Sequence, residues 1–173
     1  MAFSDDFSGA LLADGWSVEG PATISSGLGG DGTDAWFELT TSTQNHDIWN
    51  TNRAARVMQD MTDEDFSLEA RFLSTPTQRY QMQGYLVEQD AQNWLRFDTY
   101  SNGSTLYAFA AITENGSSRA AFSAAIPAGN APYLRLERVG DTYTFAYSQD
   151  GVLNAVYDLT LDDENFAYDA LFV

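Results

Sequence analysis

Two short runs that alternate between apolar and polar residues constrain the fold of this chain most strongly. They lie in Tyr80–Tyr100 and are joined by a polar connection, Glu88–Asn93. A repeat of two residues is typical of a β-strand with one buried face, whereas a repeat near 3.6 residues indicates a helix. The segment is therefore predicted to be an antiparallel hairpin.

Similar short runs recur along the chain, and turn dipeptides such as Asn102-Gly103 and Asn115-Gly116 separate several of them. The predicted strands are Gly15–Glu19, Trp36–Thr43, Phe66–Leu73, Thr105–Thr113, Arg119–Ile126, Tyr133–Val139, Thr142–Ser148 and Val152–Leu161, with a strand-like piece at Phe3–Gly9. Ser25–Asp34 is rich in glycine and predicted to be a loop, and Asn45–Asp60 fits either a helical turn or a strand. Strands of this length and spacing indicate a single all-β domain over residues 1–173, an antiparallel β-sandwich or jelly roll.

Composition excludes several classes of protein. With 14% aromatic and 44% hydrophobic residues, the 173-residue chain can bury a core and is not disordered. The 25 acidic residues outnumber eight arginines, no lysine is present, and the net charge of −17 disfavours nucleic acid as a partner. No apolar run approaches the roughly 20 residues of a membrane span, and the N-terminus lacks the pattern of a signal peptide. We expect the chain to be a module of a longer secreted protein.

The polar face of the hairpin has the chemistry of a sugar-binding surface. Gln81, Gln83 and Tyr85 are expected to share this face with Trp94, Arg96 and Asp98. A sugar presents apolar C–H faces and hydroxyls, so its site needs aromatic planes beside amides, arginine and carboxylates. Three further residues are predicted to form a rim: Trp49, Asn52 and Arg56. The alternative is a solvated face with ordinary cross-strand pairs.

Two other chemistries are compatible with the acidic residues. Glycoside hydrolysis needs two carboxylates that flank one bond, and Glu69 with Asp98 is the only pair expected on one face. Calcium takes oxygen ligands, and it is the one cofactor suggested. Its candidate ligands are Asp5 and Asp6 near the N-terminus and Asp31 and Asp34 in the glycine-rich stretch, although turn capping explains the same residues.

Four blocks of the chain carry a resemblance to a known family. Ile48–Gln59, Asp63–Phe72, Tyr80–Asp98 and Tyr133–Gly151 resemble successive parts of a concanavalin A-like lectin/glucanase jelly-roll module. The similarity extends to the C-terminal sandwich of β-xylosidases. It implies a non-catalytic, polysaccharide-binding module of an extracellular bacterial protein. A glycan-cleaving enzyme and a structural or adhesin spacer are the alternatives, since this superfamily includes all three.

The resemblance departs from the family at the C-terminus. Members continue for a further strand or two beyond the position of Leu171–Val173, where this chain stops. A first strand around Asp5–Phe7 would then lack a neighbour, and an unpaired strand edge invites association. We therefore expect either a missing C-terminal segment or edge-to-edge pairing with a second copy.

Overall fold

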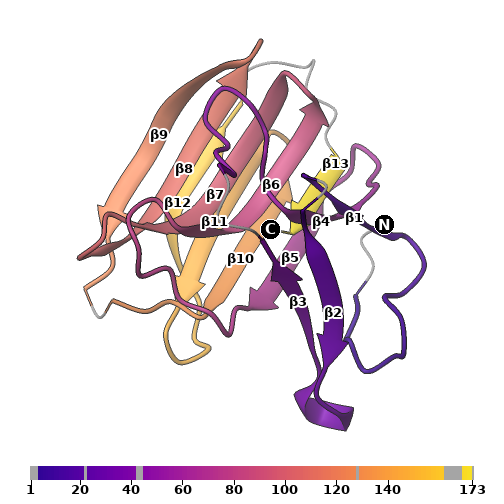
Figure 1. Cartoon of the computed structure of the whole chain (residues 1–173). Helices are drawn as coiled ribbons and strands as arrows, with labels where there is room; N and C mark the ends of the chain where they lie inside the picture. The colour runs from indigo at the N-terminus through magenta and orange to yellow at the C-terminus, as the bar shows by residue number, and fades with distance from the viewer. Residues whose placement is uncertain (1–3, 22, 42–44, 128, 162–168, 173) are drawn as a thin grey trace.

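The strands of the chain form three antiparallel sheets, as the computed structural model shows (Figure 1). It describes residues 4–21, 23–41, 45–127, 129–161 and, for the backbone alone, 169–172. The described residues include no α-helix, and a single 3-10 turn, η1, spans Gly32–Asp34. No helix in this part of the chain is long and apolar enough to cross a membrane.

Seven strands make the largest sheet, in the order β1-β4-β13-β6-β7-β8-β9. They are β1 (Trp16–Glu19), β4 (Arg56–Gln59), β13 (Asp169–Phe172), β6 (Met82–Asp90), β7 (Asn93–Ser101), β8 (Leu106–Glu114) and β9 (Ser117–Ala125). The second sheet has the order β12-β11-β10-β5, with β12 (Asn154–Thr160), β11 (Thr142–Ser148), β10 (Tyr133–Val139) and β5 (Phe66–Arg71). A separate ribbon pairs β2 (Ser25–Gly29) with β3 (Trp36–Thr40), and η1 lies at its tip.

The two larger sheets pack face to face around one core. Leu95 and Phe97 of β7 meet Leu136 of β10 and Phe145 of β11, all without exposed surface. The Phe97 ring lies 5.9 Å from Tyr143 and 6.0 Å from Phe145, its aromatic neighbours in β11, within the usual range for packed rings. The predicted all-β sandwich is therefore confirmed.

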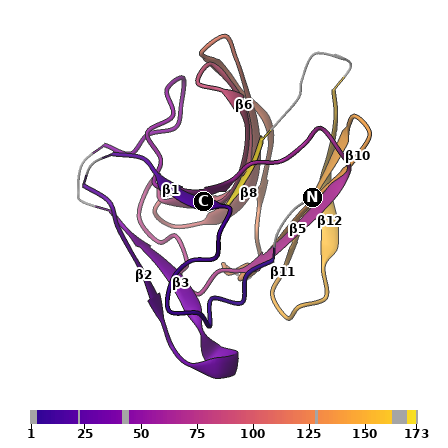
Figure 2. The same ribbon diagram turned by 90° about the vertical axis from the view of Figure 1, so that its right-hand side faces the viewer.

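The seven-stranded sheet is curved, and its hollow side faces away from the four-stranded sheet (Figure 2). We call this side the concave face. Segment 45–55 crosses one end of it. Ile48 and Ala54 pack there on Leu86 and Trp94 in a second, smaller core. At β9, Asn50 donates its backbone N–H to the Ser118 hydroxyl and accepts the Ser118 N–H at its side chain.

The other end of the concave face has no such cover in the described part of the chain. This uncovered end is formed by the start of β6, the end of β7, the start of β8 and the end of β9. Two residues of segment 45–55 have contacts toward the opposite ends of these strands: Ile48 packs in a cluster with Leu86 and Trp94, and Asn50 bonds Ser118. The concave face is thus divided into a covered end and an open end.

Two local predictions differ from the structure, and one open alternative is resolved. The glycine-rich stretch is not a plain loop, because Ser25–Gly29 forms strand β2. Of the helical turn and the strand that both fitted Asn45–Asp60, the structure has the strand, with β4 at residues 56–59. Residues 4–15 contain no strand: Asp5 accepts hydrogen bonds from the N–H groups of Phe7 and Ala13, which fold this stretch into turns.

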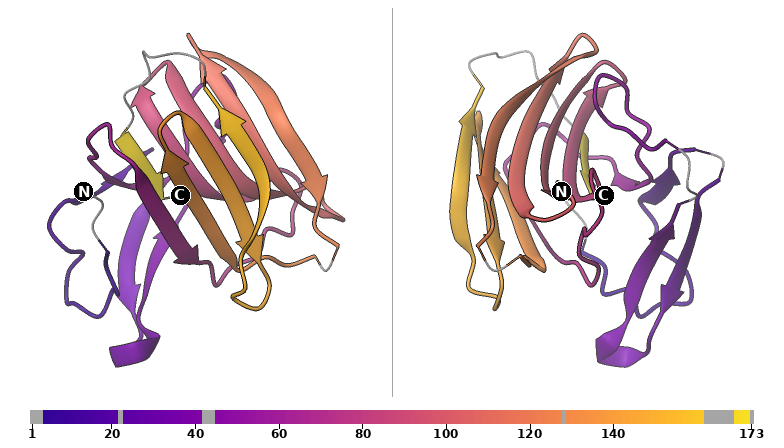
Figure 3. Two further views of the ribbon diagram at one scale, coloured as in Figure 1. Left: turned by 180° about the vertical axis from the view of Figure 1, so that it is seen from behind. Right: turned by 60° about the vertical axis from the view of Figure 1, so that its left-hand side comes forward.

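The C-terminal residues also differ from expectation. Strand β13 pairs with β6 on one side and with β4 on the other. It therefore lies inside the seven-stranded sheet, as Figure 3 shows from two further sides, and does not leave the edge that we expected beside Asp5–Phe7. Self-association stays a prediction, but the bare strand edge that was expected to cause it is not present beside Asp5–Phe7.

Candidate functional site

The centre of the concave face holds a buried ion pair between Arg96 and Asp98, neighbours on the same side of β7. The Arg96 Nε–H donates a hydrogen bond to Asp98 Oδ2. The Arg96 guanidinium also lies 4.7 Å from the centre of the Phe109 ring on β8, a distance at which cation and ring attract. Alternation along β7 places both charged side chains opposite the core-facing Leu95 and Phe97.

Asp98 is the least satisfied group of this pair. The residue is 3% exposed, and its Oδ1 atom has no hydrogen-bond partner among the described residues. Burial raises the pKa of the Asp98 carboxyl, and the charge and hydrogen bond of Arg96 oppose that rise. A buried acceptor without a donor costs about 1–3 kcal/mol. Such an atom could accept a hydrogen bond from the hydroxyl of a ligand that reaches it.

Gly84 of β6 lies directly beside Asp98 in the register of the sheet. A Cβ atom at position 84 would come within 2.5 Å of the Asp98 Cα and 2.7 Å of its Cβ. The absence of a side chain therefore allows the two strands to approach here.

Aromatic rings line the open end of the concave face. Tyr100 of β7 and Tyr107 of β8 are cross-strand partners whose rings stack at 5.1 Å, and both are partly exposed. Phe109 meets Tyr100 edge to face at 5.2 Å. The open end thus combines aromatic surface, a guanidinium and a carboxylate, which is the donor, acceptor and ring chemistry predicted for a sugar site.

The predicted face mixed residues from the two sides of β6. Pairing places Met82, Gly84 and Leu86 on the side of Arg96 and Asp98. Gln83 and Tyr85 therefore lie on the core side, and the shared face predicted for them is wrong. Tyr85 has no exposed surface and donates its hydroxyl to the Leu134 carbonyl at 2.6 Å. Burial raises its pKa, so the hydroxyl stays protonated.

The two glutamines hold the chain that leads into β6. Gln83 donates to the Ser74 carbonyl and accepts from the Ser74 hydroxyl. Gln81 accepts from the backbone N–H groups of Thr77 and Gln78. Both side-chain amides thus form hydrogen bonds with the loop 74–78. These hydrogen bonds do not point either amide toward the concave face.

Trp94 is on the predicted side of β7 but is not available to a ligand. It is 1% exposed and lies under Ile48 and Ala54 of segment 45–55. The predicted open platform at Trp94 is therefore wrong, because a segment far away in the sequence covers it.

The predicted rim residues surround the covered end. Asn52 donates to Glu88 at 2.9 Å, and Arg56 pairs with Glu19 at 2.9 Å and approaches Glu88 at 3.7 Å. Asn52 and Arg56 also line an open depression of about 740 Å³ beside β1. Trp49 is 38% exposed. Ligand binding by these three residues stays a prediction, at a place separate from the open end.

The predicted catalytic pair does not share a face. Glu69 lies on β5 of the four-stranded sheet and is exposed, while its neighbours Leu68 and Ala70 pack toward the core. Asp98 lies on the far side of the other sheet. Because the core separates the two carboxylates, they cannot flank one glycosidic bond, and this pairing was wrong.

The predicted calcium ligands do not form a cluster in the described residues, where no group of three or more His, Asp or Glu side chains comes together. Asp6 accepts hydrogen bonds from the N–H and hydroxyl of Ser8, which lower the pKa of its carboxyl. The Asp31 carbonyl accepts the Asp34 N–H at 2.9 Å at the tip of the ribbon. Calcium binding at these positions stays a prediction.

The site residues predicted from the sequence do not include Tyr100, Tyr107 and Phe109, because Thr105–Thr113 is predicted there only as a strand and Tyr100 lies at the end of the hairpin. The strand does alternate: Ala108 and Ala110 pack in the main core, and Tyr107 lies on the other side. The signal was the alternation of small and aromatic residues. These aromatic residues could have been placed on the same face as Arg96 and Asp98 only if the register between β7 and β8 had been known.

One protein family matches most of the chain. The DUF1349 family, described as a protein of unknown function, matches residues 27–162, which include both larger sheets apart from β1 and β13. The chain belongs to the DUF1349 family. None of the curated proteins compared matches it.

Solved structures similar to this DUF1349 chain share its fold at low sequence identity. GH43B of the Bacteroides ovatus xyloglucan PUL aligns with a TM-score of 0.66 at 14% identity, over 97% of this chain and 34% of that one. A variant of the GH43 protein BlXynB from Bacillus licheniformis gives 0.66 at 15% identity, over 96% and 34%. The DUF1349 chain thus spans about a third of these two proteins.

A third similar structure is closer in size. The CBM2 module of an evolved Dit protein from Lactobacillus casei phage J-1 aligns with a TM-score of 0.61 at 11% identity, over 96% of this chain and 82% of that one. At these identities the similarity establishes the β-sandwich fold. That fold occurs here in proteins related to carbohydrates.

Proposed function

We propose that the chain is a non-catalytic module that binds a polysaccharide at the open end of the concave face, within a larger extracellular protein. The observation that carries the proposal is the stacked Tyr100–Tyr107 pair, which is partly exposed at this end. Next to it along β7 lie the buried Arg96 guanidinium and the buried Asp98 carboxylate, whose Oδ1 has no partner among the described residues.

The chemistry of this end fits a neutral sugar. Asp98 Oδ1 is a hydrogen-bond acceptor and the Arg96 guanidinium a donor, and both could bind sugar hydroxyls once the side chains that bury them at this end move aside. The tyrosine rings offer surface for an apolar C–H face. Arg96 already has a counter-charge in Asp98, and the chain carries a net charge of −17, so an anionic polysaccharide is disfavoured.

The comparisons support the class of ligand and the modular setting. Two of the similar structures are GH43 proteins about three times as long as this chain, and one is a CBM2 module. A module attached to a carbohydrate-active protein would hold the substrate near the enzyme. No role in bond cleavage is proposed, since the one carboxylate pair considered is split between the sheets.

The test measures binding of the 173-residue chain to xyloglucan, xylan and laminarin, with alginate as the anionic comparison, by affinity electrophoresis. We expect binding to at least one neutral glycan and no release of reducing ends. Asp98→Asn and Tyr107→Ala should each weaken it several-fold to about tenfold, the scale of one charged hydrogen bond or one ring contact.

Tyr133→Ala is the matched control. Tyr133 is also a partly exposed tyrosine on a strand, but it lies on the four-stranded sheet, near the guanidinium of Arg71. This variant should bind as the unchanged protein does. Equal binding by all three variants, or the absence of binding to every neutral glycan, would contradict the proposal. Steady release of oligosaccharides would make the chain an enzyme.

A further inference from the structure

A second surface with sugar-binding chemistry lies on the β2–β3 ribbon, which extends beyond the two packed sheets in Figures 1 and 3. The register of the ribbon divides its residues between two sides. One side carries Leu28, Phe37 and Leu39, and Phe37 stacks on Phe7 at 5.8 Å. This side anchors the ribbon to the N-terminal turns.

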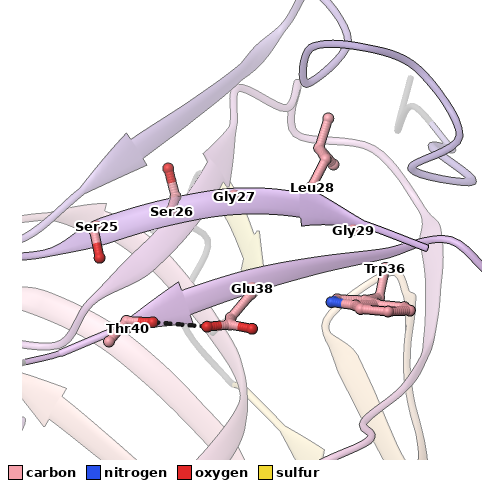
Figure 4. A pocket seen from close by; sticks show the side chains of 8 residues that line it. All are labelled: Ser25, Ser26, Gly27, Leu28, Gly29, Trp36, Glu38 and Thr40. Carbon is pink, nitrogen blue, oxygen red and sulfur yellow. Dashed lines mark hydrogen bonds between the residues drawn. The ribbon is translucent and has the colours of Figure 1, made fainter.

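The opposite side of the ribbon is an open depression of about 300 Å³. Figure 4 shows the residues around it: Ser25, Ser26, Gly27, Leu28, Gly29, Trp36, Glu38 and Thr40. The side chains of Ser26 and Leu28 project to the anchoring side. Pairing places Trp36 opposite Gly29, Glu38 opposite Gly27 and Thr40 opposite Ser25. On this side the depression therefore has one aromatic ring, two residues without side chains, and a carboxylate between that ring and the hydroxyls of Ser25 and Thr40.

Trp36 rests on the backbone of the facing strand. A Cβ atom at Gly29 would come within 2.6 Å of the indole Cε2, and one at Gly30 within 2.7 Å of Cζ3. One face of the ring is thus held flat against Gly29 and Gly30. The residue remains 37% exposed, so the other part of the indole is presented to solvent.

Hydrogen-bonding groups continue from this ring along β3. The Glu38 carboxylate accepts the Thr40 hydroxyl at 2.9 Å, and Figure 4 shows the indole nitrogen on the side of the ring toward Glu38. Residues two apart on a strand are separated by roughly 6.6 Å. A sugar stacked on Trp36 would therefore have a hydroxyl, or the next unit of a chain, within reach of Glu38.

We infer that this side of the ribbon is a second carbohydrate contact, with Trp36 as the stacking platform and Glu38 as an acceptor for sugar hydroxyls. The ligand class is a neutral glycan, because no basic residue lines the depression and a carboxylate lies at its centre. The inference takes its ligand class from the proposed function, but it rests on separate residues. Two weak contacts on one chain would raise the apparent affinity for a polymer that reaches both.

The test uses the 173-residue chain and compares a long neutral glycan with an oligosaccharide of the same repeat. By titration calorimetry the unchanged protein should bind two short oligosaccharides. Trp36→Ala should bind one and lose at least fivefold in affinity for the polymer, and Glu38→Gln should weaken the polymer about threefold without removing the ring. Tyr133→Ala again serves as the control.

The outcomes separate the two proposals. If Trp36→Ala and Glu38→Gln leave both stoichiometry and polymer affinity unchanged while Tyr107→Ala abolishes binding, the ribbon contact is refuted and the concave-face proposal stands. If Trp36→Ala abolishes binding and Tyr107→Ala has no effect, the ribbon is the binding surface and the concave-face proposal fails. Because Trp36 and Glu38 lie on a surface strand, unchanged thermal unfolding is expected for both variants and is measured alongside.

Discussion

The concave face and the ribbon each place a tryptophan beside polar side chains on alternating strand positions, yet they present them differently. Trp94 is 1% exposed under segment 45–55, whereas Trp36 is 37% exposed on a two-residue floor of glycine. The strand pattern around each tryptophan is the same. What differs is a covering segment contributed by another part of the chain. A local pattern therefore identifies a face but does not establish access to it.

The largest expected effect comes from removing each tryptophan in turn. Trp94→Ala leaves a cavity between Leu86 and Ile48 and should lower the free energy of unfolding by about 3–5 kcal/mol. Trp36→Ala opens no enclosed cavity and should cost less than about 1 kcal/mol. Urea unfolding of both variants measures the difference. Similar losses at the two positions would show that the contrast in burial is not real.

The same contrast explains how far sequence alone could lead. Period-two runs at 66–73 and 80–100 predicted strands and the sandwich, because each strand needs one apolar face for the core. The face of Arg96 and Asp98 was also correct. Gln83 and Tyr85 were assigned to the wrong face. Alternation within one strand divides its side chains between two faces, but it does not tell which of these faces is continuous with a given face of the neighbouring strand. That information lies in the register, where Gly84 meets Asp98.

The burial of Trp94 and the position of β13 in the seven-stranded sheet could not be predicted for a related reason. The cover over Trp94 depends on long-range contacts such as Asn50 with Ser118, which no local pattern reveals. The position of β13 between β4 and β6 is likewise set by pairing over more than eighty residues of sequence. The glycines of the ribbon were interpreted as a loop, although their role at Gly29 is to receive the indole of Trp36.

The pH dependence of stability distinguishes the buried carboxylate from an exposed one. Burial raises the pKa of Asp98 above its ordinary value of 3.8, so its contribution to stability is fully present in acid and is lost as pH rises through the folded-state pKa. Hydrogen bonds from Gln92 and Asn93 lower the pKa of Asp90, so its contribution is present above 3.8 and is lost as pH falls.

Asparagine at either position should remove the corresponding part of the pH profile. The stability of Asp98→Asn relative to the unchanged protein should increase as pH rises above about 3.8, offset by a constant cost for Arg96, whose counter-charge is lost. The relative stability of Asp90→Asn should decrease over the acidic range as pH rises. Thermal unfolding from pH 3 to about pH 8 measures both. Parallel profiles for the two variants would contradict the raised pKa of Asp98.

Calcium provides a smaller test at the tip of the ribbon and at the N-terminal turns. A specific site at Asp31 and Asp34, or at Asp5 and Asp6, predicts saturable stabilisation that reaches about 1.4 kcal/mol at ten times the dissociation constant. Screening of the net charge of −17 would act equally with Mg²⁺ at the same ionic strength. Melting curves in the two salts measure the difference, with Asp34→Asn and Asp5→Asn to locate it. Coincident curves would refute the calcium prediction.

Two glycines on the same side of β2 offer the smallest and most local test. A Cβ atom at Gly27 would meet nothing within 4 Å, whereas one at Gly29 would lie 2.6 Å from the Trp36 indole. Neither glycine has a positive φ angle, so alanine is compatible with the backbone at each position. Gly27→Ala should therefore leave stability unchanged or raise it by about 0.4–1 kcal/mol, because it restricts the unfolded chain.

Gly29→Ala gains the same restriction but must push the indole off the strand, so its net effect should be a loss of up to about 1 kcal/mol. Differential scanning calorimetry of the two variants gives opposite signs if Trp36 is held on the glycine floor. The displaced ring would no longer present a fixed face to a sugar. If Gly27 makes no ligand contact, glycan binding at the ribbon should therefore weaken in Gly29→Ala and stay unchanged in Gly27→Ala. Equal stability changes in the two variants would mean that Trp36 is mobile on the ribbon, and the ordered platform would lose its structural basis.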